Sequence, residues 1–339
     1  MPKDLTQFYK AKTLTGLSNI SDFEVLEEYS LLIALTNSLG RVEVFNMKTL
    51  KCLRVLNFHT TNITSYHFNK LVVHKSSGTF CSLQAPKLFQ SNVFVGNFRK
   101  NHGFSIPFEY SNSTKTIALM QDVLITAGVS SRIRFWDIHN GSFVDEICFP
   151  QNSTCITNIT PVEEKYMLIC AEETTSSLWL VSLQSKKLLR SIPLDGGQNA
   201  ITTLCNGKLA CLSHSKKLLS FWSILQKGFE KYDLQMLNKI SLDCSGNFLL
   251  ISKDNGAKQD LIAYATIDGV KFKDPSTHQT VGIMTINLRE KKLKKLPMRL
   301  FEIRGNAKQS RMMLLHDGTK ISAISVSEEF FNFGFESDE

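Results

Sequence analysis

The feature that most constrains the fold is a recurrent pair of short apolar segments. The first member of each pair is a continuous apolar run of about five residues, bounded by Ser, Asn, Gly or Asp. Such a run is typical of a strand that is buried on both faces. The runs are Leu31–Leu35, Leu71–His74, Val123–Ala127, Met167–Ala171, Lys208–Leu212, Phe248–Ser252 and Met312–His316. Their recurrence predicts seven similar β units.

A second strand follows each run after a few polar residues, and apolar and polar residues alternate in it. The second strands are Arg41–Phe45, Gly78–Leu83, Arg132–Ile138, Leu178–Leu183, Leu218–Ile224 and Lys320–Val326, while Leu261–Ile267 and Gly282–Leu288 both qualify in the sixth unit. Their last large apolar residues are Phe45, Leu83, Trp136, Val181, Trp222, Ile286 and Ile324, which lie on average about 46 residues apart. A four-stranded propeller blade repeats every 40–45 residues or so. The long intervals predict insertions in blades three and six.

Two further strands complete each unit. An Ile followed by Ser or Thr precedes several of the runs, as expected of the innermost strand, at Ile20, Ile63, Ile156 and Ile201. Basic segments after the second strands suit an exposed outer strand, because charge blocks edge-to-edge association. Since four-stranded units with two apolar faces bury both by stacking radially, the sequence predicts an all-β chain with one seven-bladed β-propeller, irregular in its blades and carrying insertions.

The two ends of the chain are predicted to share a blade. Residues 1–15 hold a plausible outer strand, which we expect to pair with Ile321–Val326 and so to close the ring. The propeller then covers residues 1–332, and residues 333–339 form an acidic tail.

One stretch resembles a known repeat. Residues 127–141 read AGVSSRIRFWDIHNG, which is similar to a blade of the WD-repeat family: a small-residue turn, an alternating strand, the pair Trp136-Asp137 and a turn ending in Gly. His59 with Ile63 resembles the family's His before its inner strand. The resemblance implies a β-propeller that binds other proteins.

The other repeats depart from the family pattern. Trp222 is followed by Ser223, Phe45 by Asn46, and the chain has no Gly-His dipeptide. These departures indicate a degenerate WD-repeat propeller, in which most blades lack the family's Asp-His-Ser/Thr-Trp hydrogen-bond network. Propellers of the citron-homology type, which lack the signature, stay an alternative.

Composition excludes several classes of protein. No apolar run reaches the roughly 18 residues that a membrane-spanning helix needs, and the first residues are polar, so we expect an intracellular protein of the nucleus or cytoplasm. The eight cysteines contain no C-x-x-C pair and are expected to be buried free thiols. The sequence predicts neither a metal site nor a cofactor.

No pattern of residues indicates catalysis. The chain lacks a G-x-S-x-G elbow, and Gly207-Lys208 is followed by Leu209 rather than by the hydroxyl that a phosphate loop needs. His74, His214 and His316 recur at the ends of apolar runs, which favours a structural role at blade turns. The sequence therefore predicts a protein that is not an enzyme.

Basic residues supply the candidate binding site. The chain carries a net charge of +8, and its densest basic strip spans residues 289–299. The residues expected to contact a partner are Lys291, Lys292, Lys294, Lys295, Arg299, Arg99 and Lys100. The leading hypothesis is a scaffold subunit, monomeric as a propeller, within an intracellular multiprotein complex. The alternative is an RNA-associated subunit of a ribosome-assembly or RNA-modification complex, which would bind RNA or another polyanion through the strip.

Overall fold

The computed structural model describes the strands of the chain and many of the turns between them. The described residues are 3–4, 9–13, 20–26, 29–36, 41–46, 49, 51–57, 66–74, 77–86, 92–100, 102–107, 114–129, 132–149, 155–162, 166–172, 177–194, 198–203, 208–213, 217–228, 231–241, 248–251, 261–266, 269–274, 277–285, 299–303, 311–316 and 321–326. Within these ranges the chain is built from strands, and no helix there is long and apolar enough to cross a membrane.

The described strands form six four-stranded sheets and one five-stranded sheet. In chain order, the first three sheets are β3 (Ile20–Leu26), β4 (Leu31–Thr36), β5 (Arg41–Asn46) and β6 (Cys52–Asn57); β7 (Tyr66–His74), β8 (Thr79–Pro86), β9 (Asn92–Asn97) and β10 (His102–Pro107); and β11 (Thr114–Met120), β12 (Val123–Gly128), β13 (Arg132–Asp137) and β14 (Phe143–Cys148). The next two are β15 (Cys155–Val162), β16 (Tyr166–Glu172), β17 (Ser177–Ser182) and β18 (Lys187–Pro193); and β19 (Gln198–Thr203), β20 (Lys208–Ser213), β21 (Leu218–Gly228) and β22 (Lys231–Ser241).

The last two sheets include the N-terminal strands. One joins β23 (Phe248–Ile251), β24 (Leu261–Thr266), β25 (Gly269–Lys273) and β26 (Thr280–Thr285) with β1 (Lys3–Asp4). The other joins β27 (Arg299–Ile303), β28 (Arg311–His316) and β29 (Ile321–Val326) with β2 (Tyr9–Thr13). β2 pairs antiparallel with β29, from Tyr9 opposite Val326 to Thr13 opposite Ser322. The sequence predicts this pairing of the two ends, while the closed seven-bladed ring and the domain limits stay predictions.

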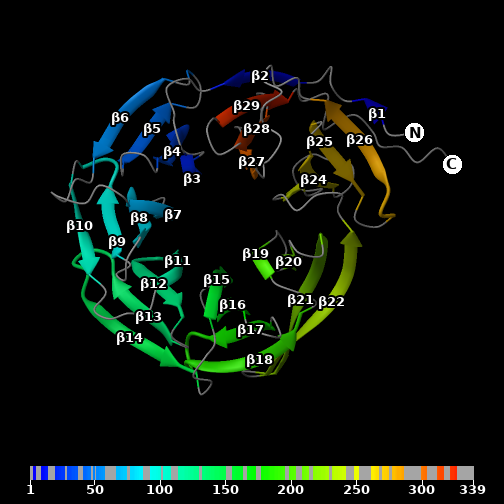
Figure 1. The fold of residues 1–339 in the computed structure, drawn as a ribbon. Helices are drawn as coiled ribbons and strands as arrows, with labels where there is room; N and C mark the ends of the chain where they lie inside the picture. Colours follow the sequence, from blue (N-terminus) through cyan, green and yellow to red (C-terminus); the bar gives the residue numbers. More distant parts are fainter. Residues whose placement is uncertain are drawn as a thin grey trace. The chain divides into compact units, whose positions relative to one another are not determined.

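The chain divides into two compact units. The larger comprises Ile20–Lys216 and Ser220–Leu237, and so holds nearly all of β3 to β22; the smaller comprises Met1–Asn19, Lys217–Leu219 and Asn238–Glu339. In the larger unit the first strands of successive sheets, β3, β7, β11, β15 and β19, pack against one another. The fourth strands, from β6 to β22, lie on the opposite side of their sheets (Figure 1).

Apolar residues from neighbouring sheets fill the space between them. Phe149 follows β14 and packs on Trp179 of the next sheet, with ring centroids 4.9 Å apart. Ile133, Phe135 and Val181 belong to the same buried cluster. The third sheet buries apolar side chains against both the second and the fourth sheet, so its stability depends on both neighbours.

A bulge recurs in the first strand of every sheet of the larger unit. In β3, β7, β11, β15 and β19, one residue is skipped in the pairing with the second strand. The skipped residues are all polar: Ser21, Asn69, Lys115, Thr157 and Asn199. A bulge increases local twist, which turns each inner strand away from a flat sheet.

In units two and six the predicted apolar run is the first strand of its sheet, whereas in the other units it is the second strand. The run Leu71–His74 lies in β7, a first strand, whereas Leu31–Leu35 and Val123–Ala127 lie in second strands. In the sixth unit, Phe248 begins the first strand, and its neighbour is β24; the alternative partner is the fourth strand, β26. A buried apolar run fits the first and second positions equally well, so periodicity cannot distinguish them.

The insertion predicted for blade three is therefore wrong. The described part of residues 84–115 includes the third and fourth strands of the preceding sheet, β9 and β10. Within residues 227–238, the described positions are strand, in β21 and β22.

Candidate functional site

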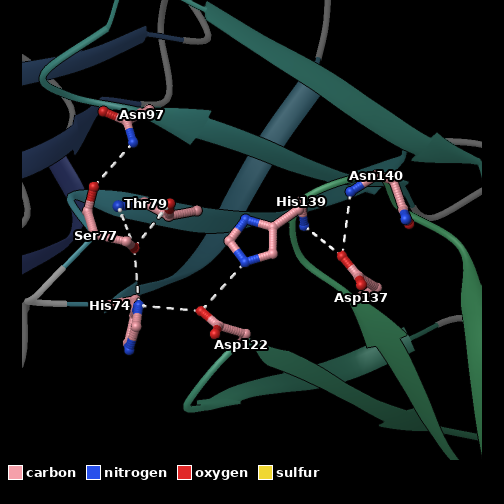
Figure 2. A network of polar contacts seen from close by, with 8 residues as sticks. All are labelled: His74, Ser77, Thr79, Asn97, Asp122, Asp137, His139 and Asn140. Atoms are coloured by element: carbon pink, nitrogen blue, oxygen red, sulfur yellow. Dashed lines mark hydrogen bonds and ion pairs between the residues drawn. The ribbon is translucent and has the colours of Figure 1, made fainter.

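Several turns of the larger unit gather at one end of their sheets. In an antiparallel four-stranded sheet, the turn after the first strand and the turn after the third strand lie at the same end. We call this end of the second and third sheets the turn edge, defined by Ser77, Gly78, Asn97–Lys100, Gln121, Asp122 and Asp137–Ser142. Figure 2 shows the polar contacts that connect these turns.

Trp136 and Asp137 fix the turn edge from the third strand of the third sheet. The Trp136 indole Nε1 donates a hydrogen bond to Thr126 Oγ1 on the neighbouring strand, at 3.0 Å. Asp137 Oδ1 accepts hydrogen bonds from the backbone amides of His139, at 2.7 Å, and Asn140, at 3.3 Å (Figure 2). Asp137 thus holds the turn after β13 together, while Trp136 fastens β13 to β12.

Trp222 makes the equivalent contact by another route. Its Nε1 donates to Ser220 Oγ, at 2.9 Å, on its own strand, and that hydroxyl donates to the Cys211 carbonyl oxygen. Both indoles are therefore satisfied by a hydroxyl, although only one of them belongs to a Trp-Asp pair.

His74, Asp122 and Ser77 are residue types of a catalytic triad, but their geometry is not that of one. Asp122 Oδ1 lies 3.8 Å from His74 Nδ1, and Ser77 Oγ lies 2.8 Å from the same nitrogen (Figure 2). A triad needs the carboxylate and the nucleophile on opposite ring nitrogens, so that the imidazole can take a proton from one side. Ser77 Oγ also donates to Thr79 Oγ1, at 2.9 Å, which makes it a turn residue.

Asp122 has a second imidazole beside it. His139 Nε2 lies 3.4 Å from Asp122 Oδ1, and the Ile138 amide donates to the Asp122 carbonyl oxygen. Among the described residues, no group of three or more His, Cys, Asp and Glu side chains is arranged to hold a metal ion. The turn edge can therefore pair charges and fix loops, but it offers neither an acid–base relay nor a ligand set.

The predicted partner-binding residues Arg99 and Lys100 lie on the turn edge and are exposed. Asn97 Oδ1 accepts hydrogen bonds from both backbone amides, at 2.9 and 3.0 Å. The Arg99 guanidinium lies 4.7 Å from the ring centroid of Tyr29, in cation–π contact. Gly78 allows the Arg99 side chain to lie close to this turn, because a Cβ added at position 78 would lie 3.0 Å from Arg99 Cγ. The φ of Gly78 is +74°, a backbone conformation that favours glycine.

The other predicted basic residues belong to the strip 289–299. Arg299 begins β27 in the smaller unit. Lys291, Lys292, Lys294 and Lys295 lie outside the described residues, as do His59, Ile63 and His214. His74 is the last residue of the first strand of its sheet, whereas His316 is the last residue of the second strand of its sheet. The prediction that these histidines recur at the same point is therefore wrong for this pair.

The cysteines only partly follow the expectation of buried thiols. Cys81 and Cys211 are buried, and burial raises the pKa of the Cys81 thiol far above its ordinary value. Cys52 and Cys148 are exposed on outer strands, which corrects the expectation. Because partial desolvation also raises the pKa of both outer thiols, these side chains stay protonated at neutral pH and react slowly as nucleophiles.

Exposed apolar side chains concentrate on the fourth strands. Of the large exposed hydrophobic residues in the described part of the chain, those on fourth strands are Leu53, Val55, Phe143, Val144, Leu188, Met236 and Leu237. The sequence indicated basic outer strands but did not reveal these apolar positions. Exposed apolar groups that recur along one side of a fold are typical of interaction surfaces.

A groove between two outer strands was also missed by the sequence prediction. It has a volume of about 630 Å³ and lies between β18 and the long hairpin of β21 and β22. The only sequence signal was the segment 227–238, in which charged and apolar residues mix without a clear period.

Of the comparisons with known proteins, only that with solved structures shows the fold. Neither a family model nor a curated protein sequence matches the chain. Among solved structures, the crystal structure of the Cps50 (Swd1) β-propeller domain of Myceliophteria thermophila is similar, with a TM-score of 0.70. The match has 10% sequence identity and covers 93% of this chain and 98% of that domain. The all-β fold that the resemblance to WD-repeat proteins implies is thereby confirmed: this chain has the β-propeller fold.

Proposed function

We propose that the protein is a non-catalytic interaction scaffold, a propeller subunit of an intracellular multiprotein complex. The observation that carries this proposal is the set of exposed apolar residues on four of the fourth strands of the larger unit, β6, β14, β18 and β22. Each exposed apolar side chain costs free energy in water, which a bound partner would recover. The turn-fixing arrangement of His74, Asp122 and Ser77 adds support, because this triad-like set in the described part of the chain is used for structure.

Purification of the tagged chain from its own cells tests the proposal. We expect a companion protein in fixed stoichiometry, measured by light scattering after size-exclusion chromatography. Three variants, Leu53→Ser, Val144→Ser and Leu237→Ser, change outer-strand positions that are each at least 46% exposed. At least one should lose the companion while its melting temperature stays within about 2 °C of the wild type.

The matched control is Lys115→Ser, which changes an exposed residue on a first strand. It should retain the companion. A chain that purifies as a monomer without companions, or a complex that all three outer-strand variants leave intact, would contradict the scaffold proposal.

The second candidate is an RNA-associated subunit, and the net charge of +8 favours it. A protein that binds RNA through its phosphates loses affinity steeply as salt rises. Retention on immobilised single-stranded RNA at low salt, lost between about 50 and 200 mM salt, would support this candidate. Absence of retention at low salt would remove it.

A further inference from the structure

The groove between the fourth and fifth sheets combines an apolar part and a charged part. Its walls are the outer strand β18 on one side and the β21–β22 hairpin on the other. β21 and β22 have eleven residues each, whereas β18 has seven. The lining residues lie within the larger unit: Arg190, Ser191, Ile192, Pro193, Trp222, Leu225, Lys227, Asp233, Leu234, Gln235 and Met236.

The apolar part lies away from the tip of the hairpin. Trp222 is 6% exposed, whereas Leu225 and Met236 are exposed by 36% and 45%. Leu225 precedes Lys227 on the strand that runs toward the tip, and Met236 follows Asp233 on the strand that returns from it. The apolar side chains are therefore further from the tip than the charged ones.

The charged part has one more cation than anion. Asp233 Oδ2 lies 2.6 Å from Lys227 Nζ, and Asp233 Oδ1 lies 3.6 Å from Arg190 Nε. The Leu234 amide also donates to Asp233 Oδ1, so both carboxylate oxygens are engaged. The closest contact of Arg190 with this carboxylate is through Nε, and its side chain is 54% exposed, so the guanidinium is accessible to a second anion. A guanidinium presents five N–H donors, so Arg190 can bind a second carboxylate.

We propose that this groove binds a short extended segment of a partner protein that carries apolar residues followed by an acidic residue. The apolar side chains pack on Leu225 and Met236, and the acidic side chain pairs with the terminal nitrogens of Arg190. The inference rests on the proposed scaffold function and deepens it, since it states which surface binds and what chemistry the partner presents.

The strand geometry also sets the spacing of the segment. Alternate side chains of an extended segment point to the same face. The apolar and acidic residues must therefore stand at positions i, i+2 and i+4 to face the groove together.

Fluorescence anisotropy with labelled synthetic peptides and the purified full chain tests the proposal. The probe peptide has the core Leu-Ser-Leu-Ser-Glu, flanked by serines. Two control peptides have the same length as the probe. One moves the Glu by one position, and the other replaces the Glu with Lys. We expect saturable binding of the probe and at least roughly fivefold weaker binding of both controls.

Two matched pairs of protein variants localise the binding. Arg190→Gln and Leu225→Ser change groove residues, and each should weaken binding of the probe by roughly tenfold. Lys187→Gln and Val129→Ser change exposed residues that do not line the groove, and each should alter binding by less than about twofold. Thermal unfolding of all four variants confirms that they are folded.

Several specific outcomes would overturn the proposal. Absence of saturable binding, equal binding of the register control, or equal loss in Lys187→Gln would each refute it. Single-stranded RNA that binds through Arg190 when the peptide does not would assign the groove to a polyanion. A chain that dimerises, and whose dimer is lost in Leu225→Ser, would assign it to a second copy. If the companion protein still purifies with Arg190→Gln and Leu225→Ser, the scaffold proposal stands and only the groove assignment fails.

Discussion

The indole of Trp136 shows how one side chain fastens two strands of a sheet. Its Nε1 donates to Thr126 Oγ1, and Thr126 is only 3% exposed, so water cannot replace the donor freely. The ring also packs edge-on against Phe143, with centroids 5.6 Å apart. A single residue therefore contributes a hydrogen bond to the second strand and an aromatic contact to the fourth.

Replacing Trp136 by Phe should separate these two contributions. The aromatic contact is largely kept, while the Thr126 hydroxyl loses its donor, which should lower the free energy of unfolding by about 1–2 kcal/mol. Urea unfolding of Trp136→Phe, Thr126→Val and the double variant measures the coupling. The two changes should be non-additive by at least about 0.5 kcal/mol. Additive effects would mean that the hydrogen bond contributes little.

Two aspartates on outer strands connect neighbouring sheets through charge. Asp145 on β14 pairs with Lys186, which precedes β18, and Asp233 on β22 pairs with Lys227 and with Arg190 of β18. The hydrogen bonds from Lys186 and Lys227 lower the pKa of Asp145 and Asp233 below the ordinary value of 3.8. A lowered pKa in the folded state stabilises the fold above the ordinary pKa, and this stabilisation is lost as the pH falls through the lowered value.

The double variant Asp145→Asn/Asp233→Asn should therefore melt below the wild type at pH 7. The difference should shrink as the pH falls below 3.8, and added salt should shrink it at pH 7, because both pairs are exposed to solvent. Thermal unfolding followed by circular dichroism across this pH range is the measurement. A difference that does not change with pH would show that packing, and not charge, is responsible.

At the scale of strands, sequence and structure differ where two strands look alike. Leu71–His74 and Leu31–Leu35 are both apolar runs, yet the first lies in an innermost strand and the second in the next strand outward. Both runs pack apolar side chains, although Val72 and Val73 are only partly buried, so hydrophobic periodicity carries no information about the order within a sheet. The same ambiguity produced the false insertion in blade three.

The candidate site was less predictable than the fold for a related reason. Trp136 and Asp137 were recognisable because their hydrogen bonds are local to one hairpin. The groove depends on Arg190 and Asp233, which are more than forty positions apart and meet only through the stacking of two sheets. No local pattern encodes such a pairing, and charged and apolar residues around Asp233 mix without a clear period.

The N-terminal strand β2 is the fourth strand of the last sheet. It pairs with β29 over five positions and therefore covers an edge that would otherwise expose unpaired backbone groups. Deleting residues 1–15 should lower the melting temperature by about 5 °C or more, because ladder hydrogen bonds and burial are both lost. Deletion of residues 333–339, the predicted acidic tail, is the control and should change it by less than about 1 °C. An unchanged melting temperature after the first deletion would contradict the role of β2.

At the scale of the whole chain, the sequence predicts a closed seven-bladed ring, and closure has a thermodynamic consequence. In a row of stacked sheets each interface adds its own stability, and end sheets can unfold separately. In a closed ring every sheet has two neighbours, so the loss of one exposes apolar faces on both sides. We therefore expect one calorimetric transition, with equal calorimetric and van't Hoff enthalpies.

The deletion of residues 1–15 sharpens this test, because β2 belongs to the smaller unit alone. If the ring is closed, the deletion lowers the temperature of the single transition, and the sheets of both units unfold together at the lower temperature. If the two units unfold independently, scanning calorimetry shows two transitions, and only the one that belongs to the smaller unit moves. Trp179 fluorescence distinguishes the cases, because this residue lies in the larger unit and should report the shift only when the units are thermodynamically coupled. Since Trp136 and Trp222 also lie in the larger unit, the tryptophan signal of the whole chain is a reporter for that unit.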